Sequence, residues 1–230
     1  MIGLWLLPLA GAAPRHWAAL EAVLDAGERE RAARFIPPAR RLQHVAAHGL
    51  KRMVLSRLTG VPAEHLRFAD DGGGKPFLAG LPGVDFSLSH CDGMVGVAAA
   101  RELSVGLDIE PLDRFVDPGV AAQFYSPLER RWLEGSAAQD QPRDRLRLWT
   151  LKEAFVKSTG GGIAQGLDHF SVDPDRLAVD VPGDPAPRLL WQDVVLGSHL
   201  AAVAGTRPPA AGGRVEQHQA LVELAALRNA

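Results

Sequence analysis

Cysteine is nearly absent from this sequence, and what is missing excludes several classes of protein. The single cysteine, Cys91, excludes an internal disulfide framework and a cysteine-rich zinc site, and is typical of a reducing compartment. No stretch approaches the ~20 apolar residues that a membrane helix needs. Residues 1–14 are apolar, but they lack a basic start and are interrupted by Pro8, which favours a first strand over a signal peptide. We therefore expect a cytoplasmic protein without a membrane segment.

Acidic side chains are missing from one long segment of the chain. The net charge of −2 argues against general nucleic-acid binding. Between residues 31 and 63, however, there is no aspartate or glutamate. The basic residues in this segment are Arg31, Arg34, Arg40, Arg41, Lys51, Arg52 and Arg57. A positive region on a slightly acidic protein indicates a locally bound anion, and the alternative is a solvated helical face.

The pattern of apolar and turn-forming residues predicts a mixed α and β chain. Its 230 residues, 47% hydrophobic and 23% charged, suit one large domain or two small ones. Expected strands are 1–14, two within 86–100 around a turn at 92–93, 105–110, 169–172, 188–194 and 199–204. Expected helices are 16–35, 40–60, 126–136 and 143–159, with glycines ending the second and the last. Residues 70–83 read as a loop, and 205–214 as a linker before a terminal helix at 219–227. Strand-rich stretches follow helices twice, which suggests two similar halves meeting near residue 105, although no clear sequence repeat is found.

Two carboxylates lie in an otherwise apolar strand, VGLDIE. Because side chains alternate along a strand, Asp108 and Glu110 share one face, with their carbons ~7 Å apart, while Leu107 and Ile109 share the other. Two like charges at that distance repel unless a cation lies between them, and Mg²⁺ prefers such oxygen ligands. The alternative is a solvent-facing edge carrying two charges.

A third carboxylate lies in the expected helix 143–159. Glu153 shares a helix face with Trp149 and with Val156 or Lys157, opposite the apolar face. A carboxylate between apolar neighbours is costly unless it is paired or binds a metal, and a simple Glu153–Lys157 contact is the alternative. Together with the strand pair, Glu153 and Lys157 would suit a metal-bound phosphate.

Four short motifs occur in a specific order: GKP at 74–76, FSLSH at 86–90, GLDIE at 106–110 and WTLKEAFVK at 149–157. Each is weak alone, but the ordered set closely resembles the 4′-phosphopantetheinyl transferases of the longer, Sfp-type branch. The resemblance runs from the basic helices to HLAAVA at 199–204, and the tail from residue 206 lies outside it. Ser87 stands where many relatives have asparagine.

The resemblance implies a set of site residues. It makes Asp108, Glu110 and Glu153 ligands of Mg²⁺, and Asp108, Glu153 and Lys157 the catalytic residues. Coenzyme A, the donor substrate, would be bound by Arg41, Lys75, Pro76, Ser89, His90, Asp108 and Lys157. Arg41 is chosen for the 3′-phosphate from four candidates in the basic segment, the others being Arg40, His44 and Lys51. Glu153 has a second implied role, as the base that takes the proton from the acceptor serine.

The resemblance also implies the fold, the partner and the reaction. The fold would be an α+β pseudo-dimer of two similar halves, with the active site in the cleft between them. Residues 1–104 would hold the coenzyme A phosphates, 105–205 the metal site and the WxxKE helix, and 206–230 a linker and terminal helix. The reaction would be transfer of 4′-phosphopantetheine from coenzyme A to a serine of an apo acyl or peptidyl carrier protein. We expect a monomer that binds neither nucleic acid nor membrane.

Other functions fit parts of the pattern. A metal-dependent phosphodiesterase or nuclease also uses paired acids followed by Glu and Lys, and it would bind nucleic acid with a steep salt dependence. A non-catalytic module that binds coenzyme A or a carrier protein would keep the basic segment without needing three carboxylates. A hydrolase built on Ser89, His90 and Cys91 is disfavoured, because adjacent strand residues point to opposite faces.

Overall fold

The computed structural model describes residues 1–70, 74–162, 166–206 and 214–220. The N-terminal half contains, in chain order, β1 (Ile2–Pro8), α1 (Pro14–Ala22), α2 (Ala26–Ala33), α3 (Pro38–Thr59), β2 (Phe68–Asp70), β3 (Pro76–Leu78), β4 (Val84–Cys91) and β5 (Met94–Arg101). The C-terminal half contains β6 (Val105–Pro111), α4 (Pro118–Phe124), α5 (Pro127–Gly135), α6 (Gln141–Thr159), β7 (Ser171–Asp173), β8 (Ala178–Asp180), β9 (Arg188–Val195) and β10 (His199–Thr206). A last strand, β11 (Val215–Gln219), follows. The α+β pseudo-dimer is confirmed, since each half runs strand, three helices, a short two-stranded sheet and a hairpin.

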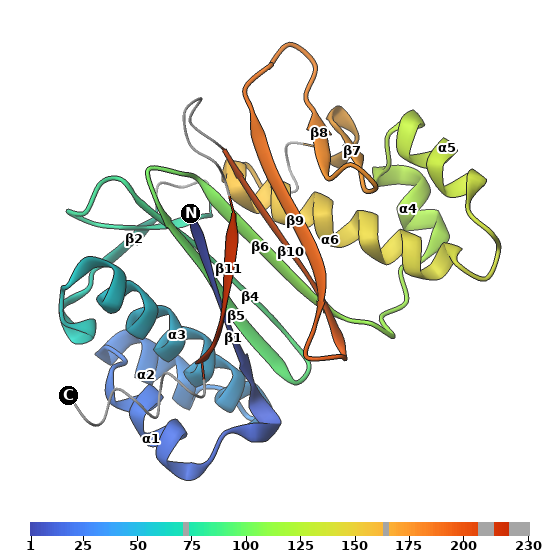
Figure 1. Ribbon diagram of the computed structural model, residues 1–230. Coiled ribbons are helices and arrows are strands. Elements are labelled where there is room, and N and C mark those ends of the chain that lie inside the picture. Colours follow the sequence, from blue (N-terminus) through green and yellow to red (C-terminus); the bar gives the residue numbers. More distant parts are fainter. Residues whose placement is uncertain (71–73, 163–165, 207–213, 221–230) are drawn as a thin grey trace.

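Two main sheets face each other between two layers of helices. The first has the strand order β11-β1-β5-β4 and the second β6-β10-β9. Helices α1 to α3 cover the outer face of the first sheet, and α4 to α6 lie beside the second (Figure 1). The inner faces meet in one apolar core, built mainly from Ile2, Leu4, Leu6, Val105, Leu107, Ile109, Ala201 and Val203. The apolar side of β6 therefore serves the joint between the halves.

The two halves contain a sequence repeat that the sequence analysis missed. Residues 2–8 read IGLWLLP and residues 105–111 read VGLDIEP. Each strand pairs with its hairpin partner in the same register, because Ile2 lies opposite Ala100 and Val105 opposite Gly205. Only the glycine, one leucine and the proline are identical, which is too few to identify the repeat without the strand register.

A glycine brings α6 directly onto β6. A Cβ atom at Gly106 would lie 1.9 Å from the carbonyl oxygen of Ala154 and 2.4 Å from the backbone nitrogen of Ser158. Any side chain at position 106 would therefore push the helix away from the strand. Because side chains alternate, Asp108 and Glu110 share this face of β6 with Gly106, beneath α6. Helix and strand together bring Glu153 and Lys157 over the strand carboxylates.

Several elements differ from the sequence predictions. The expected helix 16–35 is two helices, because Asp25 begins α2 with a capping box: its carboxylate accepts the Glu28 N–H at 2.8 Å, and the Glu28 carboxylate accepts the Asp25 N–H at 3.2 Å. The predicted loop 70–83 includes β3, and α4 and β8 were not predicted. The predicted tail of linker and helix contains β11, which pairs in parallel with β1. Residues 221–227 of the predicted terminal helix lie outside the described residues.

Candidate active site

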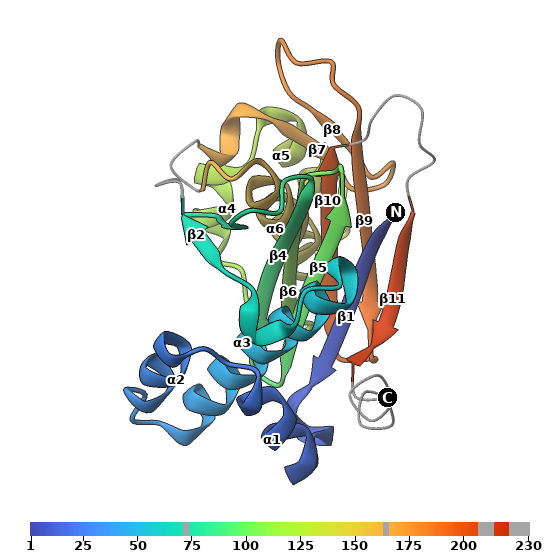
Figure 2. The ribbon, with the colours of Figure 1, turned by 90° about the vertical axis from the view of Figure 1, so that its left-hand side faces the viewer.

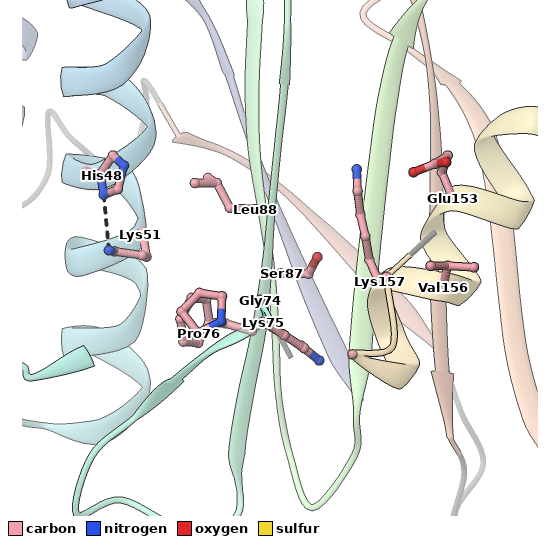
Figure 3. Close-up of a pocket in the computed structure, with 13 residues that line it drawn as sticks. His48, Lys51, Gly74, Lys75, Pro76, Ser87, Leu88, Glu153, Val156 and Lys157 are labelled. Atoms are coloured by element: carbon pink, nitrogen blue, oxygen red, sulfur yellow. Dashed lines mark hydrogen bonds between the residues drawn. The ribbon is translucent and has the colours of Figure 1, made fainter. Parts of the chain in front are cut away.

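A cavity of about 540 Å³ lies between the two halves. Side chains of α3 lie on one side of it and side chains of α6 on the other (Figure 3). Its lining consists of His48, Lys51, Gly74, Lys75, Pro76, Phe86, Ser87, Leu88, Glu153, Val156, Lys157, Gly160 and Gly162. The cavity thus draws on both halves, as expected for a site in the cleft between them.

A second cavity of about 330 Å³ shares Leu88, Glu153 and Lys157 with the first. It brings together residues of three motifs: FSLSH, GLDIE and WTLKEAFVK. Its lining consists of Leu88, Ser89, His90, Asp108, Ile109, Glu110, Arg114, Trp149, Glu153 and Lys157. All three predicted metal carboxylates line this cavity.

Two basic side chains pair with two of the three carboxylates. Lys157 Nζ lies 2.6 Å from Asp108 Oδ1, and the guanidinium of Arg114 pairs with Glu110. Asp108 and Glu110 are only 4% and 7% exposed, so these ion pairs offset the cost of burying both charges. Burial raises the pKa of Glu153, and the nearby Asp108 carboxylate raises it further. Burial also raises the pKa of Glu110, against the opposing hydrogen bond from Arg114. Three carboxylates thus share two cations in this cavity, and the crowding of like charges adds to the cost of burying them.

The carboxylates fit Mg²⁺, although they do not already form a closed metal cluster. Among the described residues, no group of three or more His, Cys, Asp or Glu is arranged to hold a metal ion. Asp108 Oδ2 and Glu153 Oε1, however, are buried oxygens without a hydrogen-bond partner in the described part of the chain. Such oxygens are the ligands that Mg²⁺ prefers, and a bound cation would relieve their burial cost. Arg114, whose side chain is 40% exposed, pairs with one oxygen of Glu110, and a carboxylate has a second oxygen for a cation.

A third cavity, of about 280 Å³, adjoins the first at His48 and Leu88. It is lined by Phe35, Arg40, Gln43, His44, Ala47, His48, Leu88 and His90. The His44 and His48 rings lie 4.1 Å apart between centroids, and Lys51 Nζ lies 2.9 Å from the carboxylate of Glu28. This part of the basic segment faces the cleft.

Arg41 lies apart from the three cavities described above. It pairs with Glu21 of α1 at 3.3 Å, and both side chains are half exposed. Its neighbour Arg40 does line the third cavity, where it donates to Gln43 Oε1 at 3.1 Å. One residue along a helix turns the side chain by about 100°, which is why a basic pair could not be resolved from sequence.

The remaining predicted residues lie where the motifs place them, with one difference in their contacts. Ser89 Oγ accepts the Ile109 N–H at 3.1 Å and donates to Asp108 Oδ1 at 3.3 Å. His90 is exposed and lines the second and third cavities. Lys75 and Pro76 line the first cavity, but Lys75 Nζ is bound to Asp85 at 2.5 Å. Lys75 is thus held by a protein carboxylate.

Sequence reasoning missed Arg114 of the second cavity and His48 of the first. Arg114 lies four residues after Glu110, with its guanidinium carbon 5.5 Å from the ring centre of Trp149. The available signal was the spacing of four residues between Glu110 and Arg114. It was hard to recognise because β6 ends at Pro111 and Arg114 lies in the following turn. His48 lies one helix turn before Lys51, so it could have been inferred from the basic face of α3.

The surroundings of Cys91 disfavour a role as a nucleophile. Burial raises the pKa of its thiol to about 12, with further contributions from Glu110 and Asp108. The reactive form of cysteine is the thiolate, which is negligible at neutral pH for such a group. This raised pKa argues against a hydrolase that uses Cys91 as its nucleophile.

Three carboxylates and two cations meet in a cavity at the cleft between two similar halves, an arrangement that suits an enzyme acting on a phosphorylated substrate. The family described as 4′-phosphopantetheinyl transferase superfamily matches residues 104–204, and that described as 4′-phosphopantetheinyl transferase, N-terminal, matches residues 12–102. The chain is 33% identical over 186 residues to 4′-phosphopantetheinyl transferase psf-1 of Bacillus pumilus, covering 80% of this chain and 78% of that protein.

Two other relatives agree. Identity is 32% over 168 residues to 4′-phosphopantetheinyl transferase HetI of a Nostoc species, covering 71% of this chain and 70% of that one. It is 29% over 200 residues to 4′-phosphopantetheinyl transferase Sfp of Bacillus subtilis, covering 80% and 88%. The chain belongs to the 4′-phosphopantetheinyl transferase family, which confirms the resemblance found in its motifs.

Proposed function

We propose that the chain transfers 4′-phosphopantetheine from coenzyme A to a serine of an apo acyl or peptidyl carrier protein, with Mg²⁺ bound in the second cavity. The serine oxygen forms a bond to the phosphorus that carries the pantetheine arm. The pyrophosphate P–O bond breaks, and adenosine 3′,5′-bisphosphate leaves. The serine proton passes to a base or to water.

One observation carries this proposal: three carboxylates and Lys157 line a cavity that opens onto the cleft between the halves. Asp108, Glu110 and Glu153 would hold the metal. When bound, Mg²⁺ supplies positive charge against the pyrophosphate oxygens as negative charge develops on the leaving phosphate. Lys157, which pairs with Asp108 in this structure, lines the same cavity, so its ammonium could turn toward a phosphate bound there.

The rest of coenzyme A would extend along the larger cavity toward α3. Pro76, Ser89 and His90 stay proposed contacts, with Lys75 considered separately below. Arg41 was the sequence prediction for the 3′-phosphate, whereas the geometry favours Arg40, since Arg40 shares a cavity with His44 and His90. An anion there would meet several donors in one place.

Glu153 is proposed as a metal ligand before it is a base. Its Oε1 is buried without a partner in the described residues, in the same cavity as Asp108 and Glu110. A carboxylate that already donates an oxygen to a cation is a weaker base, so a water molecule would mediate removal of the serine proton.

The proposal extends to organisation and setting. Residues 1–104 would supply the coenzyme A contacts, 105–205 the metal ligands, and 206–230 the tail. The protein would act as a monomer in the cytoplasm, without nucleic acid or membrane. Within the described residues, none of the helices has the length and apolar character needed to cross a bilayer.

Mass spectrometry of the carrier tests the proposed reaction. An apo acyl or peptidyl carrier protein, incubated with the chain, coenzyme A and Mg²⁺, should gain the mass of one phosphopantetheine arm on its serine. A serine-to-alanine carrier is the matched control. No mass gain across a panel of acyl and peptidyl carriers would contradict the reaction.

Glu153→Gln separates the two roles of Glu153. The amide keeps a neutral oxygen but cannot accept the proton. As a ligand, Glu153 predicts weaker Mg²⁺ binding in the variant and activity that recovers at high Mg²⁺. Near-normal binding of Mg²⁺ and coenzyme A with a loss of turnover of ~10²-fold or more would instead identify a base.

A further inference from the structure

The two halves meet along an unusual joint between β4 and β6. Three side chains of β4 accept backbone N–H groups of β6: Asp85 from Val105 at 2.7 Å, Ser87 from Leu107 at 3.0 Å and Ser89 from Ile109 at 3.1 Å. The offset is always 20 residues, so the strands run parallel, side by side in Figure 2. We call these three side chains the β4 ladder.

The β4 ladder explains an alternation in the sequence. Val84, Phe86 and Leu88 of the same strand face the helix-covered core, whereas the ladder residues between them face β6. A backbone N–H group that is buried without an acceptor is destabilising, so an apolar residue at a ladder position would leave an N–H of the β6 edge unsatisfied. The polar row therefore fixes which residue of β6 lies beside which residue of β4.

Lys75 closes one end of the β4 ladder. Its ammonium donates to Asp85 Oδ2 at 2.5 Å and to the carbonyl oxygen of Val105 at 3.0 Å, while the same Asp85 oxygen accepts the Val105 N–H. A Cβ atom at Gly160, which ends α6, would lie 3.7 Å from the Lys75 stem. Lys75 therefore touches both halves and the end of the helix that carries Glu153 (Figure 3).

At its other end, the β4 ladder reaches the metal carboxylates. Ser89 accepts from Ile109 and also donates to Asp108 Oδ1, so the last ladder position holds the backbone and the carboxylate together. Between Val105 and Ile109 the strand edge has no freedom to slide, because each alternate N–H is bound. The position of Asp108 relative to His90 and Lys157 thus depends on the joint.

We propose that Lys75 and Asp85 are positioning residues, which clamp β6 to β4 and thereby place the metal-binding carboxylates, and that Lys75 is not a phosphate contact. This rests on the proposed function, since it concerns the same site. The Lys75 side chain is only 21% exposed, and its charge is already matched by Asp85. If the Lys75 ammonium bound a phosphate instead, the Asp85 carboxylate would be left unpaired at the joint.

A double-mutant cycle over Lys75→Met and Asp85→Asn tests the clamp. Each single variant should lower kcat about tenfold and weaken binding of Mn²⁺, used as the probe metal and followed by electron paramagnetic resonance without coenzyme A. The KM for coenzyme A should change less than about twofold. Because the two residues act as one unit, the double variant should be no worse than about threefold below either single variant. Lys75→Arg, which can still donate to both oxygens, should recover most of both readouts. Arg34→Met, which removes an exposed ion pair on α2, is the control.

The opposite results are equally clear. A large rise in the KM for coenzyme A in Lys75→Met alone, with kcat unchanged, would make Lys75 a phosphate contact. Additive losses, or unchanged Mn²⁺ binding in folded variants, would also overturn the clamp. If Lys75→Met does not fold, Ser87→Ala takes its place and should weaken Mn²⁺ binding in the same way; a folded Ser87→Ala with normal Mn²⁺ binding overturns the proposal. Wild-type chain that fails to modify any carrier contradicts the proposed function, whereas the Mn²⁺ titrations still decide the clamp.

Discussion

The first strand of each half, β1 or β6, has one side that its own hairpin partner leaves open, and the two halves satisfy the backbone groups on that side in different ways. In the N-terminal half, β11 pairs in parallel with β1, from Ile2 with Val215 to Leu6 with Gln219. In the C-terminal half, β6 has the same place, and the side chains of β4 satisfy its outer edge. A backbone edge can be covered by a strand of any sequence, but the second solution needs polar side chains at set positions.

The strands that correspond to each other show where that requirement applies. From the hairpin registers, Leu189 and Trp191 of β9 take the places that Asp85 and Ser87 have in β4. These two residues of β9 pack against the core between the sheets. Likewise, Trp5 of β1 corresponds to Asp108 of β6, and Trp5 packs into the core that α1 to α3 cover. Corresponding strands of the two halves therefore share their backbone pairing, while the polar ladder and the carboxylate pair occur in only one strand of each set.

Both halves share a buried device that anchors the long helix. In each, the glutamate of a capping box binds a fully buried cation: Glu28 binds Arg52 of α3 at 2.5 Å, and Glu129 binds Lys152 of α6 at 2.6 Å. Arg52 and Lys152 are both 0% exposed. Lys152 directly precedes Glu153, so the anchor fixes the rotation of α6 about its axis.

The largest expected effect is the difference between a substitution in β6, which carries the proposed metal ligands, and one in β9, which carries none. Asp108→Ala should lower turnover by at least about 10²-fold and weaken Mn²⁺ binding, because the carboxylate is a proposed metal ligand. The fold should persist, since the change also relieves repulsion with Glu110 and Glu153. Asp193→Ala on the exposed end of β9 is the matched control. Full metal-dependent activity in the folded Asp108→Ala would make this residue structural.

The next effect tests the anchor that the halves share. Lys152→Met should destabilise the protein by about 3–5 kcal/mol, because it leaves the buried Glu129 without its cation. Arg52→Met should cost less, because Glu28 keeps its ion pair with Lys51 at 2.9 Å. Chemical denaturation measures the loss. Adding Glu129→Leu to Lys152→Met should restore much of it, since the unpaired charge is then gone. A double variant as unstable as the single one would show that packing, and not charge, sets the cost.

A smaller effect concerns the anion contacts of the N-terminal half. Arg40→Ala should weaken coenzyme A about tenfold and dephospho-coenzyme A much less, because only the former has the 3′-phosphate. Arg41→Ala, the matched neighbour, should change both affinities less than about threefold, since this side chain pairs with Glu21. Calorimetric titration gives both constants. A larger loss of coenzyme A affinity in Arg41→Ala than in Arg40→Ala would favour Arg41, the residue predicted from sequence for the 3′-phosphate.

The smallest effect is a difference in acid stability. Burial alone would raise the pKa of Glu28, but hydrogen bonds from His48, Lys51 and Arg52 outweigh it and hold the pKa well below its usual range. A lowered folded pKa gives stability that is complete above the unfolded pKa of about 4.3 and is lost as the pH falls below it. Glu28→Gln should therefore lose less stability than the wild type between pH 5 and 3, whereas Glu30→Gln, on the exposed side of α2, should follow the wild type. Parallel acid profiles for the wild type and Glu28→Gln would contradict the assignment.

Sequence reasoning predicted the elements that have a strong pattern. The α3 and α6 helices, the hairpins and β6 followed from periodicity and from glycines that take positive φ at Gly60 and Gly160. It could not predict β11, whose five residues alternate little, or the four layers, which depend on which face of each sheet is covered. The capping box that divides the first expected helix was present as D-x-x-E and was overlooked.

The candidate site was predictable to the extent that spacing determines it. Asp108 and Glu110 on a strand, and Glu153 and Lys157 on a helix, meet as alternation and helix geometry require. The contacts of Lys75 were not predictable, because its partner Asp85 lies on another strand and Val105 in the other half. Side-chain partners across a joint depend on tertiary structure, which no local pattern contains.

The β4 ladder has a consequence for how such a cleft can change over generations. Main-chain pairing is insensitive to most substitutions, so a joint made that way keeps its geometry while sequences drift. A joint made from side chains changes by single codons, and a longer or shorter acceptor at position 87 would widen or narrow the seam between the halves. The width of the cleft between the halves could therefore be altered one residue at a time, without remodelling either half.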